Sequence, residues 1–315
     1  MKDERARNWS EYNKALVQRG SITLWFDAAS FKQKPPQLVS RGRPKQYQDP
    51  LIEACLLLKN VFHLTFRKLE GFLESLLSLS QIQEKVPNYT TLCRRQEGLS
   101  LGPLKQLKKH LGTPIDIVVD STGLKIYGEG EWCIKKHGKQ HQRTWSKVHL
   151  AVDAETLDIV SCELTTSRVQ DGPVLKTFLD KIKRPIREVI ADGAYDKFPC
   201  YEAVESRGGQ ALFPPQTGAR LSEETKHHKK LAGLEAIKQR DRTVEETRRI
   251  GKPAWKKAVG YHRRSLAETT MYRLKQLLGE RLRSKNIKNQ ALEMKIRCHI
   301  LNKMIALGRP ARLDA

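Results

Sequence analysis

The sequence predicts an α/β fold in which helices flank a mixed β-sheet, with an all-helical region ahead of the sheet. Two changes along the chain support this prediction. Apolar residues recur at helical spacing through much of residues 1–112, and short β-branched runs take their place from residue 113 onward. The chain has 315 residues, of which 39% are apolar, so it can bury a large core.

Residues 1–112 are predicted to form a helical DNA-binding region. The segments "DPLIEACLLLKNVFHL" and "TFRKLEGFLESLLSL" have helical apolar spacing, and "PNYTTLCRRQ" opens with Pro and Asn, as helices often do. A helix-turn-helix would explain these three segments and would place Arg94 and Arg95 on its recognition helix. An ordinary three-helix bundle used for packing or dimerisation explains the pattern equally well.

A basic loop, "RGRPK" at residues 41–45, precedes these segments. Its sequence resembles an AT-hook core. The extended side chains of Arg41 and Arg43 would suit a narrow A·T minor groove. A basic linker is an equally good explanation.

Strands connected by helices are predicted from residue 113. The runs "IDIVVD", "KVHLAVD", "DIVSCELT" and "REVIAD" have the length and β-branched content of strands. Between the last two, "DGPVLKTFLDKI" is an amphipathic helix for which Asp171 is the predicted N-cap. A further helix is predicted at about residues 198–206. This order of elements predicts an α/β layer fold with a mixed sheet.

Two segments complete the region 113–315. Residues 217–258 lack strand texture and are densely charged, so they are predicted to be a helical insertion or a mobile basic arm that touches DNA. The last helix carries one apolar stripe and is predicted to pack on the sheet. The stripe consists of Met294, Cys298, Leu301 and Ile305.

The composition predicts a nucleic-acid-binding protein. Lys and Arg number 58 against 35 Asp and Glu, which gives a formal net charge of +23. A membrane-surface protein would share that charge. However, the N-terminus is charged where a secretory signal needs apolar residues, and the apolar runs are far too short to span a bilayer. The prediction is a soluble cytoplasmic protein without a membrane partner. The six cysteines include no CxxC pair, which argues against a zinc site or a disulfide framework.

Two of the predicted strands end in an acid. Asp120 ends "IDIVVD" and Asp192 ends "REVIAD", and the carboxyl ends of neighbouring strands are where open α/β sheets place their ligands. Each acid alone could simply form a strand-end turn, but that explanation leaves the recurrence unexplained. A third acid on a helix beside them would complete a set of oxygen ligands of the type that Mg²⁺ or Mn²⁺ prefers. Glu268 is the candidate for that third acid.

Glu268 lies among basic and aromatic residues in "YHRRSLAETTMYRLK", residues 261–275. On a helix advancing about 100° per residue, Tyr261, Arg264 and Lys275 fall within roughly 40° of Glu268 around the axis. Leu and Met residues occupy another side, as expected of a helix docked on a core. An ordinary solvated helix with an Arg264 and Glu268 pair explains the segment taken alone.

Residues 113–310 resemble the catalytic domain of bacterial insertion-sequence transposases of the Asp-Asp-Glu class. The first two acids occur in "VVDSTG" and "IADGAYD", and the third occurs in the family signature of Tyr, two residues, Arg, three residues, Glu, six residues and Lys. The signature matches at Tyr261, Arg264, Glu268 and Lys275.

This resemblance implies a ribonuclease-H-like fold and an activity. The activity would be metal-dependent cleavage at the terminal inverted repeats of a transposon, followed by transfer of the freed 3′-hydroxyl to target DNA. It implies that Asp120, Asp192 and Glu268 hold two Mg²⁺ or Mn²⁺ ions. Tyr261, Arg264 and Lys275 would contact double-stranded DNA near the scissile phosphate. It also implies a homodimer or larger assembly that works at the bacterial nucleoid.

Two other functions fit the same residues. One is a structure-selective nuclease with the same three acids but without strand transfer. The other is a transposase-derived DNA-binding regulator without catalysis, although its acids would be expected to have decayed. Trp132 and Trp145 flank the basic run "CIKKHGKQHQR" and could stack on bases, or could anchor a loop in the core.

Overall fold

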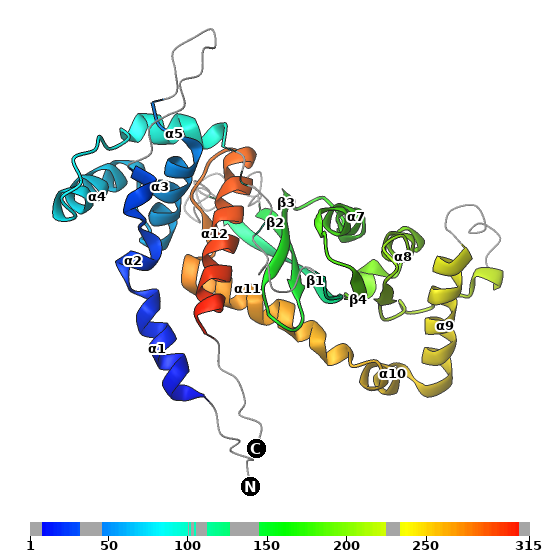
Figure 1. Ribbon diagram of the computed structural model, residues 1–315. Coiled ribbons are helices and arrows are strands. Elements are labelled where there is room, and N and C mark those ends of the chain that lie inside the picture. Colours follow the sequence, from blue (N-terminus) through cyan, green and yellow to red (C-terminus); the bar gives the residue numbers. More distant parts are fainter. Residues whose placement is uncertain are drawn as a thin grey trace, which may run out of the picture. The chain divides into compact units, whose positions relative to one another are not determined.

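The computed structural model describes residues 8–31, 46–99, 101, 104, 112–126, 145–224 and 234–308. The chain divides into two compact units (Figure 1). A helical unit joins residues 1–102 with residues 286–315, and a sheet unit spans residues 103–285. The units divide between residues 102 and 103, whereas the predicted boundary is residue 112, and the C-terminal segment groups with the helical unit.

The helical unit contains the predicted N-terminal helices. Its elements are α1 (Trp9–Arg19), α2 (Ile22–Trp25), the 3₁₀ turn η1 (Ala28–Phe31), α3 (Asp49–Val61), α4 (Phe66–Leu79), α5 (Tyr89–Glu97) and α12 (Ile287–Leu307). Thr65 caps α4 by accepting a hydrogen bond from the backbone N–H of Lys68, and Asn88 caps α5 by accepting one from Thr90. The α4 stripe of Leu69, Leu73 and Leu77 is buried.

The connections between α3, α4 and α5 bear on the predicted helix-turn-helix. Residues 62–65 make a short turn between α3 and α4, whereas the nine residues 80–88 separate α4 from α5. A helix-turn-helix has a turn of about three or four residues, so only the α3–α4 connection has that length. The Glu70 carboxylate accepts hydrogen bonds from the Tyr89 N–H at 2.8 Å and the Asn88 side chain at 3.0 Å, and so fixes the start of α5. The three helices form a packed bundle whose use in DNA binding stays a prediction.

Helix α12 packs with α3, α1 and α5, so the prediction that it packs on the sheet is wrong. Its predicted stripe is largely buried, as are polar residues on its other sides. Among these, Arg297 donates a 2.7 Å hydrogen bond to Glu293, and both side chains are buried. An apolar stripe predicts that a helix docks on a core, but it contains no information about which core.

The sheet unit contains a mixed sheet, as predicted. Its strands are β1 (Ile115–Ile126), β2 (Trp145–Asp153), β3 (Ile159–Thr166), β4 (Ile186–Ile190), β5 (Gln210–Leu212) and β6 (Arg281–Leu282). The order is β3-β2-β1-β4-β5, with β6 also paired to β1. The β1–β2 and β2–β3 pairs are antiparallel, and the β1–β4, β4–β5 and β1–β6 pairs are parallel. This mixed sheet flanked by helices agrees with the expected ribonuclease-H-like fold.

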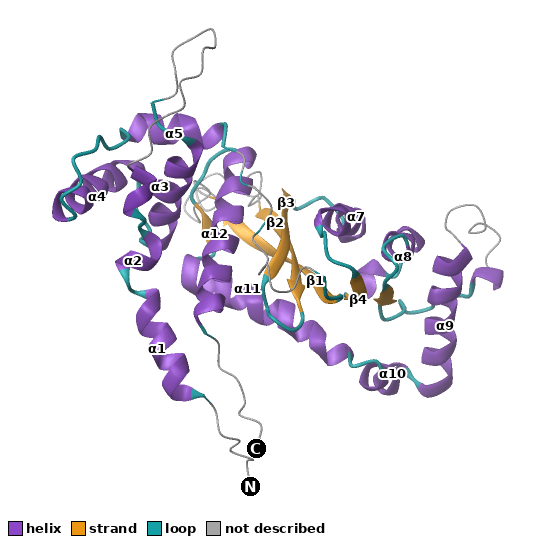
Figure 2. Cartoon of the chain, viewed as in Figure 1, coloured by secondary structure: helices purple, strands orange, loops and turns teal. Residues whose placement is uncertain are grey.

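Helices cover both faces of the sheet (Figures 1 and 2). On one face α7 (Asp171–Lys181) and α8 (Phe198–Glu205) pack side by side over a core that includes Ile117 and Val119 of β1. Val118 faces the other way, toward α11 (Ser265–Leu278) and the 3₁₀ turn η6 (Tyr261–Arg264) that precedes it. Because strand side chains alternate between faces, Asp120 and Thr122 share the α11 side with Val118.

The N-cap of α7 is Gln170, and the prediction that Asp171 caps this helix is wrong. The Asp171 carboxylate accepts a 2.9 Å hydrogen bond from Lys147 on β2 instead. Its Oδ1 also lies 3.1 Å from the Nδ1 of the buried His149. Asp171 is the first residue of α7, and its carboxylate binds Lys147 and does not cap the helix. His149 also pairs with Thr165 at 2.8 Å, which agrees with a structural role.

The charged insertion is helical where it is described. The 3₁₀ turn η5 (Ser222–Glu224), α9 (Leu234–Ile250) and α10 (Lys252–Ala258) fall in residues 217–258. Helix α9 packs against α8 and β5, and α10 packs against α9 and η6. These contacts favour the helical insertion over the mobile arm for the described residues. Whether the insertion touches DNA stays a prediction.

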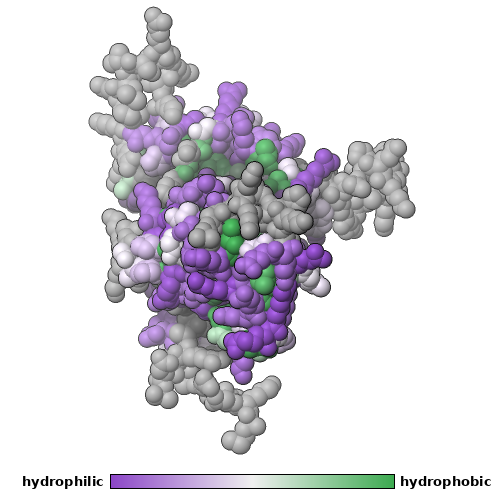
Figure 3. Space-filling view, turned by 90° about the vertical axis from the view of Figure 1, so that its right-hand side faces the viewer, coloured by the Kyte–Doolittle hydropathy of each residue, from purple (hydrophilic) through white to green (hydrophobic). Residues whose placement is uncertain are grey.

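The described helices include none that is long and apolar enough to cross a membrane. Hydrophilic residues cover most of the face in Figure 3, with small hydrophobic areas between them. This surface agrees with the high content of charged residues, 30% of the chain.

Candidate functional site

Asp120 and Asp192 lie at equivalent positions on neighbouring strands. Val118 of β1 pairs with Ile190 of β4, and each acid comes two residues after its member of that pair. Because β1 and β4 are parallel, both acids lie beyond the same rung of the ladder, toward the carboxyl end of β4. The predicted adjacency of these two strands is therefore present.

Local hydrogen bonds orient both carboxylates. The Asp120 Oδ1 accepts from the backbone N–H of Ser121 at 2.8 Å. The Asp192 Oδ1 accepts from the N–H of Ala194 at 2.9 Å and so caps the 3₁₀ turn η4 (Gly193–Tyr195). Asp192 thus forms the turn contact expected of Asp at a strand end. Asp120 instead lies inside β1, which continues to Ile126, so the prediction that Asp120 ends its strand is wrong. Each acid keeps oxygen atoms for another partner.

Glu268 lies in the first turn of α11, and Arg264 connects it to Asp120. The Arg264 guanidinium donates to the Glu268 carboxylate and, through Nη1 at 3.3 Å, to the Asp120 Oδ2. The Glu268 side chain is 52% exposed, whereas the Asp120 side chain is 18% exposed. We call Asp120, Asp192 and Glu268 the acid site.

The three carboxylates interact electrostatically. Burial raises the pKa of Asp120, and the Ser121 N–H and the Arg264 charge oppose that effect. The charges of Asp192 and Glu268 raise the pKa of Asp120 further. Like charges at this proximity resist simultaneous ionisation unless a cation joins them.

The ligand chemistry of the acid site fits a hard divalent cation, because all three side chains offer carboxylate oxygens. The spacing is not that of a formed metal site, however. Among the described residues, no group of three or more His, Cys, Asp or Glu side chains is spaced to hold a metal ion. The Arg264 guanidinium instead supplies the positive charge between Asp120 and Glu268. That Asp120, Asp192 and Glu268 hold metal ions stays a prediction.

Tyr261 does not share the helical stripe predicted for it. It belongs to η6, where it is buried, and its hydroxyl donates to the Ala191 carbonyl oxygen at 3.1 Å. Burial also raises the pKa of Tyr261 to about 12. Because Ala191 directly precedes Asp192, this bond connects the start of the Glu268 segment to the second acid. The structure thus gives Tyr261 a packing role, and its predicted contact with DNA stays a prediction.

Replacing Tyr261 by Phe is expected to destabilise the fold by about 1–3 kcal/mol, because the Ala191 carbonyl loses its partner inside the protein. Tyr272→Phe is the matched control, since Tyr272 lies on α11 and is 64% exposed. Urea unfolding of the two variants, compared with wild type, measures the difference. If Tyr261→Phe kept wild-type stability but bound DNA less tightly, Tyr261 would be a DNA contact and not a packing residue.

Arg264 and Lys275 lie near the acid site as predicted. Lys275 donates a 2.7 Å hydrogen bond to the Thr122 hydroxyl, two residues beyond Asp120 on the same face of β1. Both cations are therefore held to β1 or its acids by direct contacts.

The other residues predicted to contact DNA differ in their surroundings. Arg94 is exposed on α5, but Arg95 is bound to the Tyr47 carbonyl at 2.6 Å and to Asp49. Trp145 begins β2 and its ring covers Gly123 of β1, where an added Cβ would lie 3.4 Å from the ring. This contact favours the anchoring role for Trp145 over base stacking. Arg41, Arg43 and Trp132 lie outside the described residues.

Sequence reasoning missed the cluster that fixes η6. Arg263 donates to Asp116 of β1 at 2.8 Å and to Glu188 of β4 at 2.6 Å. Arg187 also binds Asp116, at 2.6 Å and 2.7 Å. An ion-pair cluster therefore fastens the segment ahead of Glu268 to both strands that lead to the other acids. The signal in the sequence is Asp116 itself, a charged residue inside the otherwise apolar strand "IDIVVD".

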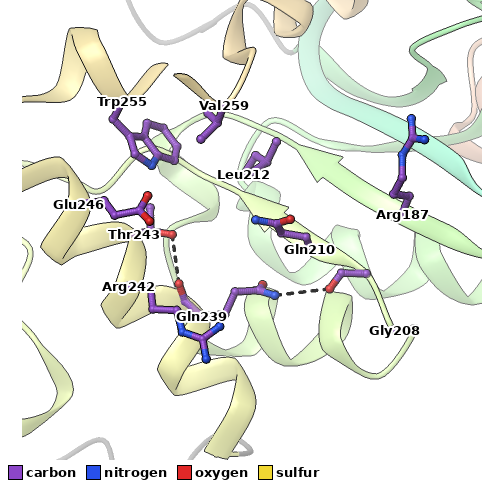
Figure 4. A pocket seen from close by; sticks show the side chains of 11 residues that line it. Arg187, Gly208, Gln210, Leu212, Gln239, Arg242, Thr243, Glu246, Trp255 and Val259 are labelled. Atoms are coloured by element: carbon purple, nitrogen blue, oxygen red, sulfur yellow. Dashed lines mark hydrogen bonds between the residues drawn. The ribbon is translucent and has the colours of Figure 1, made fainter. Parts of the chain in front are cut away.

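A pocket of about 550 Å³ lies away from the acid site, between β5, α9 and α10 (Figure 4). Gln239 of α9 lines it and closes the free edge of β5. Its side chain accepts from the Ala211 N–H at 2.9 Å and donates to the Gly209 carbonyl at 3.5 Å. The Gln239 side-chain amide thus binds backbone groups at the edge of β5 that could otherwise pair with a strand of another chain.

Two family models match most of the chain, and their matches overlap at residues 112–129. The family model described as "Transposase DDE domain" matches residues 112–303, and a second model of the same description matches residues 17–129. An uncharacterized protein of Aquifex aeolicus (strain VF5) is 29% identical over 178 residues, which is 52% of this chain and 53% of that protein. The chain thus spans about half the length of this curated relative.

Two solved structures show weak overall similarity. One is a piggyBac transposase synaptic complex with hairpin DNA, with a TM-score of 0.42, 10% identity, and coverage of 96% of this chain and 77% of that one. The other is a Drosophila P element transposase strand transfer complex, with a TM-score of 0.31, 8% identity, and coverage of 95% and 85%.

Proposed function

Because this chain belongs to the transposase DDE-domain family, we propose that it is a DNA transposase. Its reaction would be cleavage at the terminal inverted repeats of a transposon and transfer of the freed 3′-hydroxyl to target DNA. One observation carries the proposal. Asp120 and Asp192 follow the same rung of the β1–β4 ladder, and Glu268 is joined to Asp120 through Arg264.

Asp120, Asp192 and Glu268 would hold Mg²⁺ or Mn²⁺, and we propose two ions. When bound, the metal supplies activation of the attacking oxygen and stabilisation of the leaving oxygen in an in-line displacement at phosphorus. The chain's own part is to present the carboxylates. Hydrogen bonds from the Ser121 and Ala194 N–H groups orient two of them, and α11, which lies on the face of the sheet that Asp120 shares, carries Glu268.

Arg264 is the residue that would change partners in this reaction. It now donates to Asp120 and Glu268, and a guanidinium binds phosphate oxygens with the same geometry. We propose that Arg264 turns from the carboxylates to the scissile phosphate when DNA is bound, which frees both acids to act as ligands. Lys275, held by Thr122, would supply a second charge for the same backbone.

The DNA duplex of the transposon end would also contact the helical unit and the insertion. Arg94 is exposed on α5, and Lys257 is exposed on α10, whose neighbour is η6. Arg41 and Arg43 of the basic loop are further proposed contacts. We propose that the protein acts as a homodimer or larger assembly on paired ends, in the bacterial cytoplasm at the nucleoid.

The test is a cleavage and joining assay with purified protein. A labelled duplex that carries the native transposon end is incubated with Mg²⁺, Mn²⁺ or EDTA, and a pre-cut end with a free 3′-hydroxyl is supplied beside a second duplex. We expect nicking at the end in Mg²⁺ or Mn²⁺, no nicking in EDTA, and joining of the pre-cut end. Nicking without joining would identify a nuclease, and binding without either reaction would identify a regulator.

A further inference from the structure

A buried ion pair connects the insertion to the turn that follows Asp192. Asp196 is 6% exposed, and Arg240 of α9 is 8% exposed. The Arg240 Nε donates to the Asp196 Oδ1 at 3.0 Å. Charges this deeply buried are tolerated when they are paired and their remaining donors and acceptors are satisfied.

Other polar atoms of the pair also have partners. The Asp196 Oδ2 accepts from the Gln216 N–H at 2.9 Å, and Tyr201 donates to Oδ1 at 3.4 Å. On the other side, the Arg240 Nη1 donates to the Arg220 carbonyl at 2.9 Å. The guanidinium also lies over the Phe198 ring, 4.8 Å from its centre. The pair is therefore specific in geometry and ties α9 to α8 and to the chain after β5.

Gln216, which binds Asp196, also binds η4, the turn that follows Asp192. The Gln216 side chain donates to the Gly193 carbonyl at 3.0 Å. A Cβ at Gly193 would lie 3.2 Å from the Pro214 carbonyl oxygen, so the turn approaches this neighbouring segment closely. The Asp192 carboxylate is oriented by the Ala194 N–H of this turn. A shift of Asp196 would therefore move the donor that orients Asp192.

We propose that Arg240 is a positioning residue for the second acid. By holding Asp196, helix α9 fixes the turn in which the Ala194 N–H orients the Asp192 carboxylate. The insertion thus serves the acid site through its buried side, in addition to any contact of its exposed side with DNA. The consequence for catalysis rests on the proposed function, whereas the consequence for the turn does not.

The control is a second buried ion pair of the same length in the same unit. Arg184 donates to Asp153 at 3.0 Å, and their side chains are 5% and 4% exposed. Both residues of this pair precede β4 in the sequence, whereas the turn of Asp192 follows β4. Arg240→Met and Arg184→Met each leave one buried carboxylate without its cation, so both variants are expected to lose comparable stability. Only Arg240→Met should disturb the turn.

Native-state hydrogen exchange at residue resolution tests the turn directly. We expect the amides of Ala194, Tyr195 and Asp196 to exchange roughly tenfold faster or more in Arg240→Met than in wild type, and at the wild-type rate in Arg184→Met. In the cleavage assay, we expect kcat to fall by roughly 10- to 100-fold in Arg240→Met while KM for DNA stays within about twofold.

Arg240→Lys extends the test if Arg240→Met does not fold, because it keeps the charge but cannot reproduce the guanidinium contacts with both Asp196 and Arg220. It should give smaller changes in the same direction. Unchanged exchange in the turn, or equal changes in Arg240→Met and Arg184→Met, would overturn the proposal. If the wild type does not cleave DNA, the exchange result still decides whether Arg240 positions the turn, so the inference and the proposed function can fail separately.

Discussion

Asp120→Asn and Asp192→Asn are each expected to lower the rate of strand cleavage by roughly 10³-fold or more, because each removes a charged ligand of metal ions that supply several kcal/mol of transition-state stabilisation. An amide keeps the shape of the side chain but lacks the negative charge. The rate of nicking at a transposon end, measured in Mg²⁺ and in Mn²⁺, tests the prediction. Asp180→Asn, an exposed acid at the end of α7, is the matched control and should cleave as wild type does.

The stability of Asp120→Asn separates a loss of catalysis from a loss of folding. Burial raises the pKa of Asp120, so the folded protein binds a proton there more tightly than the unfolded chain does. The contribution of Asp120 to stability is therefore greatest at low pH and declines as the pH rises through the raised pKa. Asn is neutral at every pH. Asp120→Asn should be at least as stable as wild type near neutral pH in metal-free buffer, and cleavage by such a folded variant would contradict the assignment.

The placement of the acids could be predicted from the sequence because it depends on local rules. An Asp follows each of two short apolar runs, and parallel pairing of the two runs brings the acids together even though β1 continues past Asp120 to Ile126. The position of Glu268 on a docked helix follows from the apolar residues on the opposite side of that helix. These patterns repeat within a few residues, so they can be recognised without knowing the fold.

The contacts that hold the acid site could not be predicted in this way, because they join distant segments. Tyr261 reaches the Ala191 carbonyl, and Arg263 reaches Asp116 and Glu188, across separations of 70 to 147 residues. Which cation pairs with which acid depends on the strand order and on the depth of each side chain. The same limit explains Asp171, whose carboxylate binds Lys147 of a neighbouring strand although local rules favour a helix cap.

Three independent contacts converge on the segments that carry the acids. Tyr261 binds the residue before Asp192, Arg263 fastens η6 to β1 and β4, and Lys275 holds α11 to β1 beyond Asp120. A cluster of like charges is unfavourable by itself, so its geometry must be imposed by the surrounding structure. Arg264 offsets part of the repulsion in the present arrangement. Tyr261 and Lys275 thus bind protein groups beside the acids in this structure.

DNA affinity is expected to fall steeply with salt. The chain carries a formal charge of +23, and binding that neutralises six or more phosphates would weaken by roughly 10³-fold or more between about 50 and 200 mM salt. Titration of a labelled transposon end at several salt concentrations gives the slope of log affinity against log salt. A flat response would show that the basic surface is not the binding surface.

Neighbouring arginines on α5 refine this measurement. Arg94 is exposed, so Arg94→Gln should reduce the magnitude of the slope by about 0.9 if this residue contacts a phosphate. Arg95 is already bound to the Tyr47 carbonyl and to Asp49, so Arg95→Gln should leave the slope unchanged while it lowers stability. Because the two substitutions remove the same charge from adjacent positions, a difference in slope would report the phosphate contact and not the net charge. Wild-type slopes for both variants would show that Arg94 does not contact a phosphate.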